Sequence, residues 1–274
     1  MTSTLRHLSA GAAACLVLAG CKQEISPGLA VNNRITVKML AQNTLPAPVG
    51  RLDQGTGRFI LYADNRLDYN VQTNTLQGGD RISGAAIHSG DAGTNGPVVL
   101  TLDVGNGEGN AFGGVANLTA AQADIITGKT PGYLSVRSNR APNGLMRVQF
   151  DDKVTWAKEG VAMGSGEWPV VNTPARGNFW FRLTEAGILY SNISVSGLPA
   201  GDAITMAHIH TGARRTNGPV SINLFPAGAS DLGKTVKITL TAAQRATLTG
   251  GGAIYLNVHS TRFPGGIVRY QIRG

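Results

Sequence analysis

The chain contains an internal duplication, and this repeat constrains its fold more than any other feature of the sequence. Four blocks in the first half return in the second half, each 122 positions further on. The pairs are 85–90 with 207–212, 94–98 with 216–220, 118–122 with 240–244, and 133–136 with 255–258. One offset across four separate blocks indicates two copies of one domain, with no net insertion between the matched positions.

Each copy has the sequence pattern of a β-rich domain. In the second copy, residues 179–183 and 189–195 alternate apolar with polar side chains, as half-buried strands do. Turns rich in Gly, Pro and Asn separate the other short apolar runs, and the chain has 37 glycines. Those runs are residues 205–210, 220–225, 235–240, 254–259 and 267–272. We therefore expect an all-β fold of two tandem β-sandwich domains of Greek-key or immunoglobulin-like type.

One short helix is expected in each copy, at the repeated Leu-Thr-Ala-Ala-Gln block. In the second copy, Thr241 is the expected N-cap of this helix and Gly250 its expected end. The rest of each copy carries no helical periodicity, so the helix is an addition to the sandwich rather than part of a helical layer.

The repeat and the shifts in composition divide the chain into five parts. We expect a lipoprotein signal peptide at 1–20, an N-terminal tether at 21–45 and a degenerate first sandwich at 46–150. A linker at 151–171 and a second sandwich at 172–274 follow. The linker is assigned to a stretch rich in glycine and charge, which includes Lys158-Glu159-Gly160 and Gly164-Ser165-Gly166.

The N-terminus has the pattern of an export signal. Arg6 and His7 precede an apolar run at 10–20, which is shorter than the roughly 20 residues that span a bilayer. The run ends in Leu18-Ala19-Gly20-Cys21, which resembles the lipobox of bacterial lipoproteins. The resemblance implies cleavage before Cys21 and lipidation of its sulfur, and several acyl chains hold a soluble domain on a membrane. An ordinary secretory signal with a chance cysteine is the alternative.

Composition narrows the compartment and the partners. The chain has two cysteines, Cys15 and Cys21, and the first lies within the signal, so neither a disulfide nor a thiolate metal site is expected. The net charge of +8 suits a position near anionic lipid or polysaccharide. The basic residues are scattered singly in an exported chain, so no nucleic-acid partner is expected. Lys22 gives no retention signal of the aspartate kind, which favours the outer membrane or the periplasmic face of the envelope.

The second copy resembles the CHRD domain, a module of chordin and of many bacterial secreted proteins. The resemblance covers nearly all of residues 172–274, and the first copy resembles the same domain more weakly. It implies a β-sandwich and says little about chemistry, since the molecular function of the family is poorly defined. The family commonly has Glu before its final Ile-Arg, whereas this chain has Ile267-Val268-Arg269 there. The motifs that carry the resemblance are residues 207–212 (AHIHTG), 217–220 (NGPV), 240–244 (LTAAQ), 256–260 (LNVHS) and 263–269 (FPGGIVR).

Three histidines of the second copy form a candidate metal site. His208 and His210 are two residues apart on an expected strand, so their imidazoles share one face, which Met206 also shares. His259 ends another expected strand, and three nitrogens surround one site if that strand faces the first across the mouth of the sandwich. Imidazole suits copper, zinc and nickel. A site without thiolate fits an oxidising periplasm, so copper is favoured, with zinc as the alternative.

This pattern resembles the copper ligands of copper/zinc superoxide dismutase, another β-sandwich, where His-x-His on a strand joins a distant third histidine. The bridging histidine and the acidic zinc ligands of that enzyme have no visible counterpart here, so dismutase activity is not expected. Because fold does not settle function, the analogy concerns the site alone.

The first copy tests the metal interpretation within the chain itself. At the positions that match the three histidines it has Ala86, His88 and Arg137. Two of three candidate ligands are absent, so the first copy is not expected to bind metal in the same way. The competing interpretation is structural: histidines at one end of a sandwich also hydrogen-bond to loop carbonyls or cap a turn.

The sequence therefore predicts an exported lipoprotein that binds a transition metal through His208, His210 and His259. The alternative is a non-enzymatic structural or adhesive envelope protein that binds a protein or polysaccharide partner. No Gly-x-Ser-x-Gly motif, P-loop or dinucleotide fingerprint is present, so no catalytic residue is assigned. A copper-dependent redox activity is the one enzymatic option left open.

Overall fold

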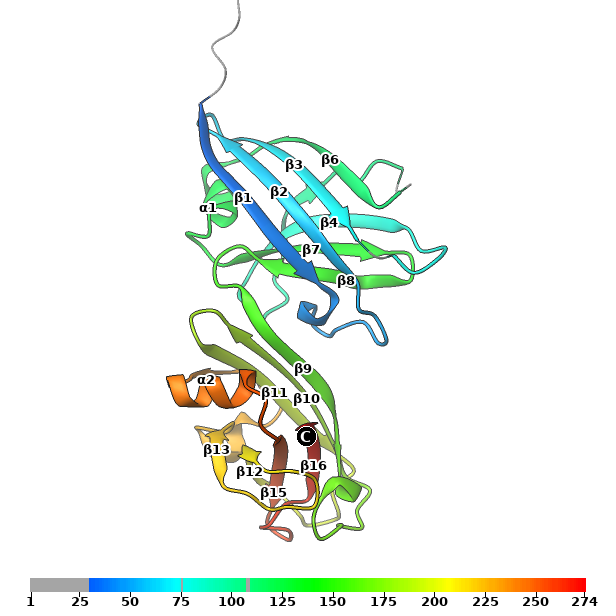
Figure 1. Ribbon diagram of the computed structural model, residues 1–274, viewed down its shortest axis with the longest axis vertical. Helices are drawn as coiled ribbons and strands as arrows, with labels where there is room; N and C mark the ends of the chain where they lie inside the picture. The colour runs from blue at the N-terminus through cyan, green and yellow to red at the C-terminus, as the bar shows by residue number, and fades with distance from the viewer. Residues whose placement is uncertain (1–29, 75, 107–108) are drawn as a thin grey trace, which may run out of the picture.

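The computed structural model describes residues 30–74, 76–106 and 109–274. Within these ranges the chain forms two similar β domains, drawn one above the other in Figure 1. The predicted signal peptide at 1–20 and the predicted lipidation site Cys21 lie outside the described residues. None of the helices in the described part of the chain has the length and apolar character needed to cross a membrane.

Each domain is a sandwich of two four-stranded antiparallel layers. In the first domain, one layer has the order β5-β4-β7-β8 and the other β1-β2-β3-β6, and a single residue pair, Leu40 with Arg147, joins β1 to β8. The strands are β1 (Val31–Leu40), β2 (Gln54–Tyr62), β3 (Arg66–Thr73), β4 (Ile82–Ser89), β5 (Val98–Leu102), β6 (Ala111–Asn117), β7 (Gly132–Ser138) and β8 (Ala141–Gln149).

The second domain repeats this arrangement strand for strand. Its layers have the orders β13-β12-β15-β16 and β9-β10-β11-β14, joined by the pair of Arg269 with Met163. The strands are β9 (Val154–Met163), β10 (Arg176–Thr184), β11 (Ile188–Ser196), β12 (Ile204–Thr211), β13 (Val220–Asn223), β14 (Val236–Thr239), β15 (Ile254–Ser260) and β16 (Val268–Arg273). The predicted all-β fold of two sandwiches is confirmed.

The strand order adds a detail that the sequence did not give. The second and third strands of each domain, β2 with β3 and β10 with β11, pair within one layer. In an immunoglobulin constant domain the corresponding strands lie in opposite sheets. The strand order of each sandwich therefore differs from that of an immunoglobulin domain. The first three strands lie in one layer, and the other layer begins at β4 or β12.

The predicted short helices are present, α1 (Ala120–Ile126) and α2 (Ala242–Thr249). Thr241 is the N-cap of α2: its hydroxyl accepts the backbone N–H of Gln244, whose side chain accepts the backbone N–H of Thr241 in return. Thr119 and Gln122 form the same capping box on α1. Gly250 follows the last residue of α2, as expected. These reciprocal bonds satisfy donors that the first turn of a helix leaves free.

The predicted tether at 21–45 and linker at 151–171 are wrong over much of their length. Strand β1 pairs with β2 from Val31 to Leu40, and β9 pairs with β10 from Val154 to Met163, so both segments are sheet strands. The charged residues that suggested a linker lie on opposite faces of β9: Glu159 faces outward to Arg182, whereas Lys158 lies on the face of Phe181 and reaches the Tyr270 ring. When only composition is considered, a strand that contains charged residues and glycine resembles a linker.

The hydrophobic core of each domain lies between its two layers. On β10, Phe179, Phe181 and Leu183 alternate inward and are almost fully buried, opposite Ile209 and Leu256 from the other layer. The β15 strand is unusual because its outward-facing residues are buried as well. The loop at 212–219 and the segment around Glu167 cover part of the outer face of this layer, so Asn257 and Arg269 there are removed from bulk water.

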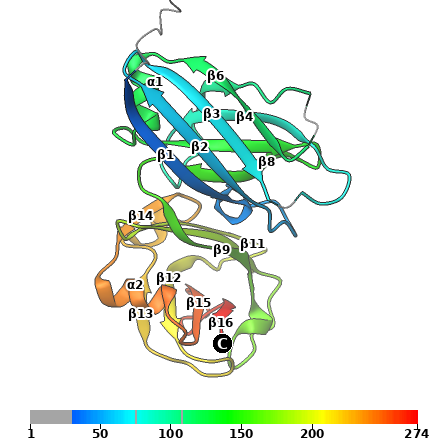
Figure 2. The same ribbon diagram turned by 45° about the horizontal axis from the view of Figure 1, so that its top comes forward.

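The β9-β10-β11 layer of the second domain faces the first domain, and the β12-β15-β16 layer faces away from it (Figure 2). At the junction Arg182 is fully buried, donates to the Thr44 carbonyl of the first domain and pairs with Glu159 at 3.3 Å. The backbone N–H of Ala47 donates to the same Glu159 carboxylate at 3.2 Å. Arg182 therefore connects the two domains through its bond to Thr44, and its ion-pair partner Glu159 does so through Ala47.

We expect Arg182→Ala to destabilise the protein by about 3 kcal/mol, because it empties a buried site and leaves Glu159 and the Thr44 carbonyl without their donor. Equilibrium denaturation of the purified chain measures the change. Arg176→Ala, on the same strand but exposed, is the matched control and should cost no more than about 0.5 kcal/mol. Equal losses in the two variants would contradict a stabilising role for the domain junction.

Candidate metal centre

His208, His210 and His259 come from two neighbouring strands of the layer that faces away from the first domain. Strands β12 and β15 pair antiparallel, with Met206 opposite His259, His208 opposite Asn257 and His210 opposite Tyr255. These side chains all lie on the outer face of the layer, since Ala207, Ile209 and Val258 between them fill the core. The predicted alternation on β12 is confirmed. The strand of His259, expected to face β12 across the mouth of the sandwich, instead pairs with it in the same layer.

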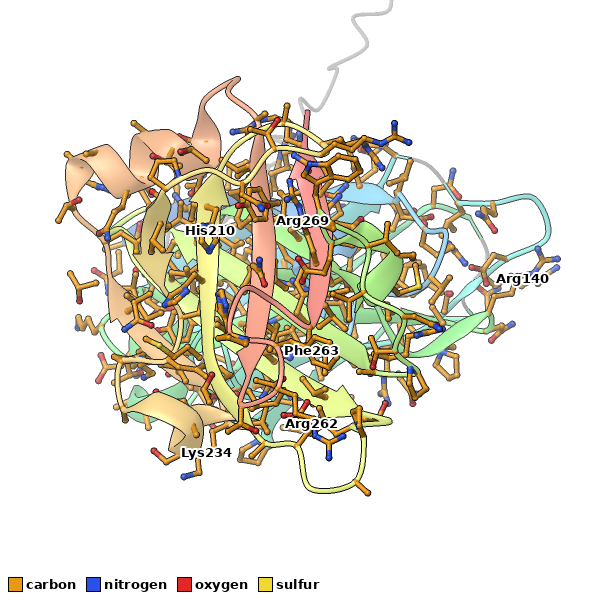
Figure 3. The ribbon with its side chains drawn as sticks, turned by 90° about the horizontal axis from the view of Figure 1, so that it is seen from below. Arg140, His210, Lys234, Arg262, Phe263 and Arg269 are labelled. Carbon is orange, nitrogen blue, oxygen red and sulfur yellow. The ribbon has the colours of Figure 1, made fainter. Side chains whose placement is uncertain are left out.

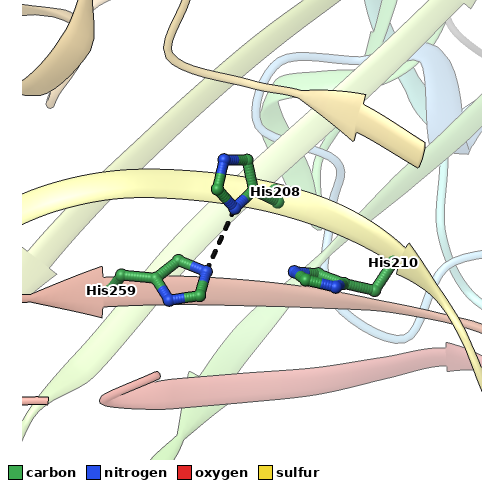
Figure 4. Close-up of side chains that lie close together, drawn as sticks. All are labelled: His208, His210 and His259. Atoms are coloured by element: carbon green, nitrogen blue, oxygen red, sulfur yellow. Dashed lines mark hydrogen bonds between the residues drawn. The ribbon is translucent and has the colours of Figure 1, made fainter. Parts of the chain in front are cut away.

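The three imidazole rings converge (Figure 4). One ligand nitrogen from each ring can be chosen so that all three lie within 4.8 Å of one another, and Nδ1 of His208 lies 3.1 Å from Nε2 of His259. Two nitrogens bound to one zinc or copper ion at about 2.0–2.1 Å lie at most about 4 Å apart. The first pair already meets this limit, and the rest of the cluster needs a contraction of less than about 1 Å.

Main-chain carbonyls fix which nitrogens are free to bind an ion. Nδ1 of His210 lies 2.9 Å from the Gly218 oxygen, and Nδ1 of His259 lies 2.9 Å from the Pro264 oxygen. A carbonyl only accepts, so Nδ1 carries the proton in both rings and Nε2 keeps its lone pair. Metal-binding histidines in proteins usually donate their second ring nitrogen in this way. Nε2 of His210 is buried and has no hydrogen-bond partner.

His208 offers the third ligand nitrogen, which is its Nδ1 rather than Nε2. Since Nε2 of His259 is an acceptor, the 3.1 Å contact has the Nδ1 proton of His208 as its donor. Nδ1 of His208 would hold an ion in the other tautomer of this ring, with the proton on Nε2, and the ring would stay neutral. The donors offered to an ion are then Nδ1 of His208 and Nε2 of His210 and His259.

The surroundings keep all three imidazoles uncharged. Burial, followed by repulsion from His259 and His210 when they are protonated, lowers the pKa of His208 to about 4. Burial also lowers the pKa of His210 and of His259, although their carbonyl partners oppose the shift. Neutral imidazole is the form that binds metal ions, so the site is ready to bind at neutral pH without releasing protons.

Part of this site is shared by both domains and is structural. The ring of His210 stacks on that of Tyr255, with 4.9 Å between the ring centres. The guanidinium carbon of Arg269 lies 3.4 Å from the centre of the same Tyr255 ring. In the first domain His88 stacks on Tyr133 at 4.7 Å, and Arg147 lies 3.5 Å from the ring centre. Nδ1 of His88 contacts the Gly96 oxygen at 2.9 Å, as His210 contacts Gly218. The structural interpretation is therefore correct for this histidine position, which orders a loop in each copy.

The two copies differ at the positions of the other two histidines of the cluster. Beside His88, the first domain has Ala86 where the second has His208, and Arg137 where the second has His259. The guanidinium of Arg137 lies against Gly84, which is the position of Met206. The first domain thus has the same loop-ordering stack without the two added imidazoles, so packing of the strand does not require them.

Sequence reasoning missed Glu167, because it lies in the segment assigned to the linker. Its carboxylate is buried, accepts from Nδ2 of Asn257 at 3.4 Å and leaves Oε1 without a partner. Burial raises the pKa of Glu167 to about 8, against the opposing charge of Arg269. Asn257 lies opposite His208, so Glu167 approaches the cluster through one side chain. Thr44 takes the structurally equivalent place in the first domain, directly after the short helix at 41–43 as Glu167 follows the one at 164–166.

The loop from 212 to 219 closes one side of the site. Figure 3 looks onto this layer, with His210 and Arg269 toward one end and Phe263 toward the other. Arg269 donates to the carbonyls of Ala213 and Thr216, and Asn217 donates to the Trp168 carbonyl at 2.7 Å. The predicted Asn-Gly-Pro turn therefore joins this loop to the segment that carries Glu167, which holds the Gly218 carbonyl against His210.

A larger opening lies elsewhere in the described part of the chain. A cavity of about 640 Å³ at the junction of the domains is lined by residues 46–51 and by residues of β9, β10 and β11, including Trp180. The histidine cluster is separate from it, on the opposite layer. His208 and His259 are partly exposed, so an ion reaches them from solvent without a change in the fold.

We expect the stability of the metal-free protein to fall as the pH drops from about 6.5 toward 4. The unfolded chain protonates its histidines near pH 6.5, whereas the folded chain holds the pKa of His208 near 4, so the unfolded state binds more protons in this window. In His208→Asn the slope of unfolding free energy against pH should be shallower, by less than the 1.4 kcal/mol per pH unit of one full proton. Melting in chelator at several pH values measures it, and parallel curves would contradict the depressed pKa.

Comparison with known proteins agrees with the duplication. A family model described as the CHRD domain matches the chain twice, at residues 35–150 and 161–272. The first match includes part of β1 and the second includes part of β9, which are the first strands of the two domains. Searches of curated proteins and of solved structures found no match.

Proposed function

The chain belongs to the CHRD-domain family, with two tandem copies of the domain, and from this premise we propose that the second copy binds a transition-metal ion. The protein that carries it is, in this proposal, an exported lipoprotein of the cell envelope. The first copy keeps the fold and the loop-ordering stack and serves as a spacer or as a surface for partners.

One observation carries the metal assignment: three imidazoles converge so that one nitrogen of each lies within 4.8 Å of the others, and two of the rings are held by main-chain carbonyls. Imidazole nitrogens without thiolate or carboxylate favour copper, with zinc as the alternative. An ion bound there completes its coordination from solvent or from a neighbouring side chain. The residues of the chain hold the ion, orient the rings through Gly218 and Pro264, and exclude water from the side covered by the 212–219 loop.

The chemistry of the site supports binding rather than catalysis. The buried acid near it, Glu167, bonds to Asn257 and not to the imidazoles. A redox activity through an open position on a bound copper ion is the remaining enzymatic option. Copper-loaded protein that is inactive toward superoxide and peroxide would exclude it.

We expect the mature chain to bind one Cu(II) or Zn(II) ion with an affinity that drops at least about 100-fold in the double variant His208→Ala/His210→Ala, since two of three ligands are lost. Calorimetric titration measures this. His88→Ala is the matched control, because it removes the equivalent stacked histidine of the first domain and leaves the cluster intact. Binding that the double variant leaves unchanged would end the metal assignment.

The envelope location rests on the lipobox-like Leu18-Ala19-Gly20-Cys21. We expect Cys21→Ser expressed in a bacterium to move the protein from the membrane fraction to the soluble periplasmic fraction, because the variant has no sulfur to acylate. Cys15→Ser, inside the signal, is the control and should leave the protein in the membrane fraction. Retention of both variants in the membrane would contradict a lipid anchor at Cys21.

The alternative, a structural or adhesive protein that binds an envelope polysaccharide or protein, is supported by the cavity at the domain junction. Its lining combines the ring of Trp180 with the polar side chains of Asn178, Asn192 and Ser194. This combination of an aromatic face and hydrogen-bonding groups is what a polar ligand with an apolar face requires. The metal titration separates the two functions, because an adhesive role at the cavity makes no use of the histidines.

A further inference from the structure

Met206 stands at the open end of the histidine cluster. It lies directly opposite His259 across the β12-β15 pair and two residues before His208 on the same face. Its side chain is 42% exposed, whereas the neighbouring Ala207 is fully buried. The side chain of Met206 therefore leaves β12 on the face that carries the two partly exposed imidazoles, next to His259.

The distances between these positions allow the sulfur to reach an ion held by the histidines. Side chains directly opposite in an antiparallel pair have Cβ atoms about 4.5–5.5 Å apart. Methionine has three rotatable bonds and no branch, so its sulfur moves over several ångströms without a change in the backbone. The neighbouring imidazole of His259 is fixed by Pro264, so the flexible partner in this pair is Met206.

Comparison of the two copies also singles out Met206. The first domain has Gly84 at this position, and there the guanidinium of Arg137 lies over the strand. Met206, His208 and His259 replace Gly84, Ala86 and Arg137, while the stacked histidine, tyrosine and arginine are kept. The methionine thus differs between the copies together with the two added imidazoles, and an exposed methionine contributes little to the core.

We propose that Met206 supplies a thioether ligand to the ion, so that the site prefers Cu(I) over Zn(II). The inference rests on the proposed metal site and extends it to the oxidation state of the metal. Thioether sulfur is a soft ligand that binds Cu(I) well and Zn(II) poorly, whereas imidazole binds both. Three nitrogens and one sulfur complete a four-coordinate environment for Cu(I).

The test compares Met206→Leu with wild type under anaerobic, reducing conditions. Competition with a chromogenic Cu(I) chelator should show that the variant binds Cu(I) about 10-fold more weakly or worse, whereas its Zn(II) affinity changes less than about twofold. Copper X-ray absorption should show a Cu–S distance in the wild type and none in the variant. Met163→Leu is the matched control, because Met163 is 41% exposed on β9 and has the same side chain.

The outcomes separate this inference from the proposed function. Unchanged Cu(I) affinity in Met206→Leu, with no Cu–S distance in the wild type, would overturn the thioether ligand even if the histidine variants abolish binding. Loss of affinity in the histidine variants together with a Cu–S distance in the wild type supports both. Metal binding that neither the histidine variants nor Met206→Leu affect removes the site itself.

Discussion

Antiparallel pairing of β12 with β15 sets Met206 opposite His259 and His208 opposite Asn257, and the candidate site depends on this register. Because side chains alternate between the faces of a strand, a shift of one residue on either strand would turn its members of the cluster into the core. Ile209 and Val258, which fill the core between the site residues, oppose such a shift. The hydrophobic core thereby determines where the polar cluster lies.

The carbonyls of Gly218 and Pro264 orient the imidazoles of His210 and His259. Each fixes the proton on one imidazole and leaves the opposite nitrogen free. The first domain shows how the arrangement is built: the stack of His88, Tyr133 and Arg147 orders the same loop without any cluster. The second domain keeps that stack and adds His208 and His259 to it, so a structural histidine, His210, also becomes a candidate ligand.

Much of this could be predicted from the sequence, and the misses have physical reasons. The repeat and the alternation predicted two sandwiches, and the spacing of His208 and His210 predicted that they share a face. The first strand of each domain was missed, because β9 contains Lys158-Glu159-Gly160 and its composition is that of a linker. Glu167 was missed with it, since its burial comes from contacts with Asn257 and Gly266, far away in the chain. No local pattern indicates the carbonyl partners of the histidines, which belong to loops.

The most direct test of the account is the position of the ion itself, measured by anomalous diffraction from crystals of the mature chain grown with copper. The account predicts one peak in the second domain, about 2.0–2.1 Å from Nδ1 of His208 and from Nε2 of His210 and His259, and none beside His88. A copper peak elsewhere, or the three rings in their metal-free contacts with no peak between them, would contradict it.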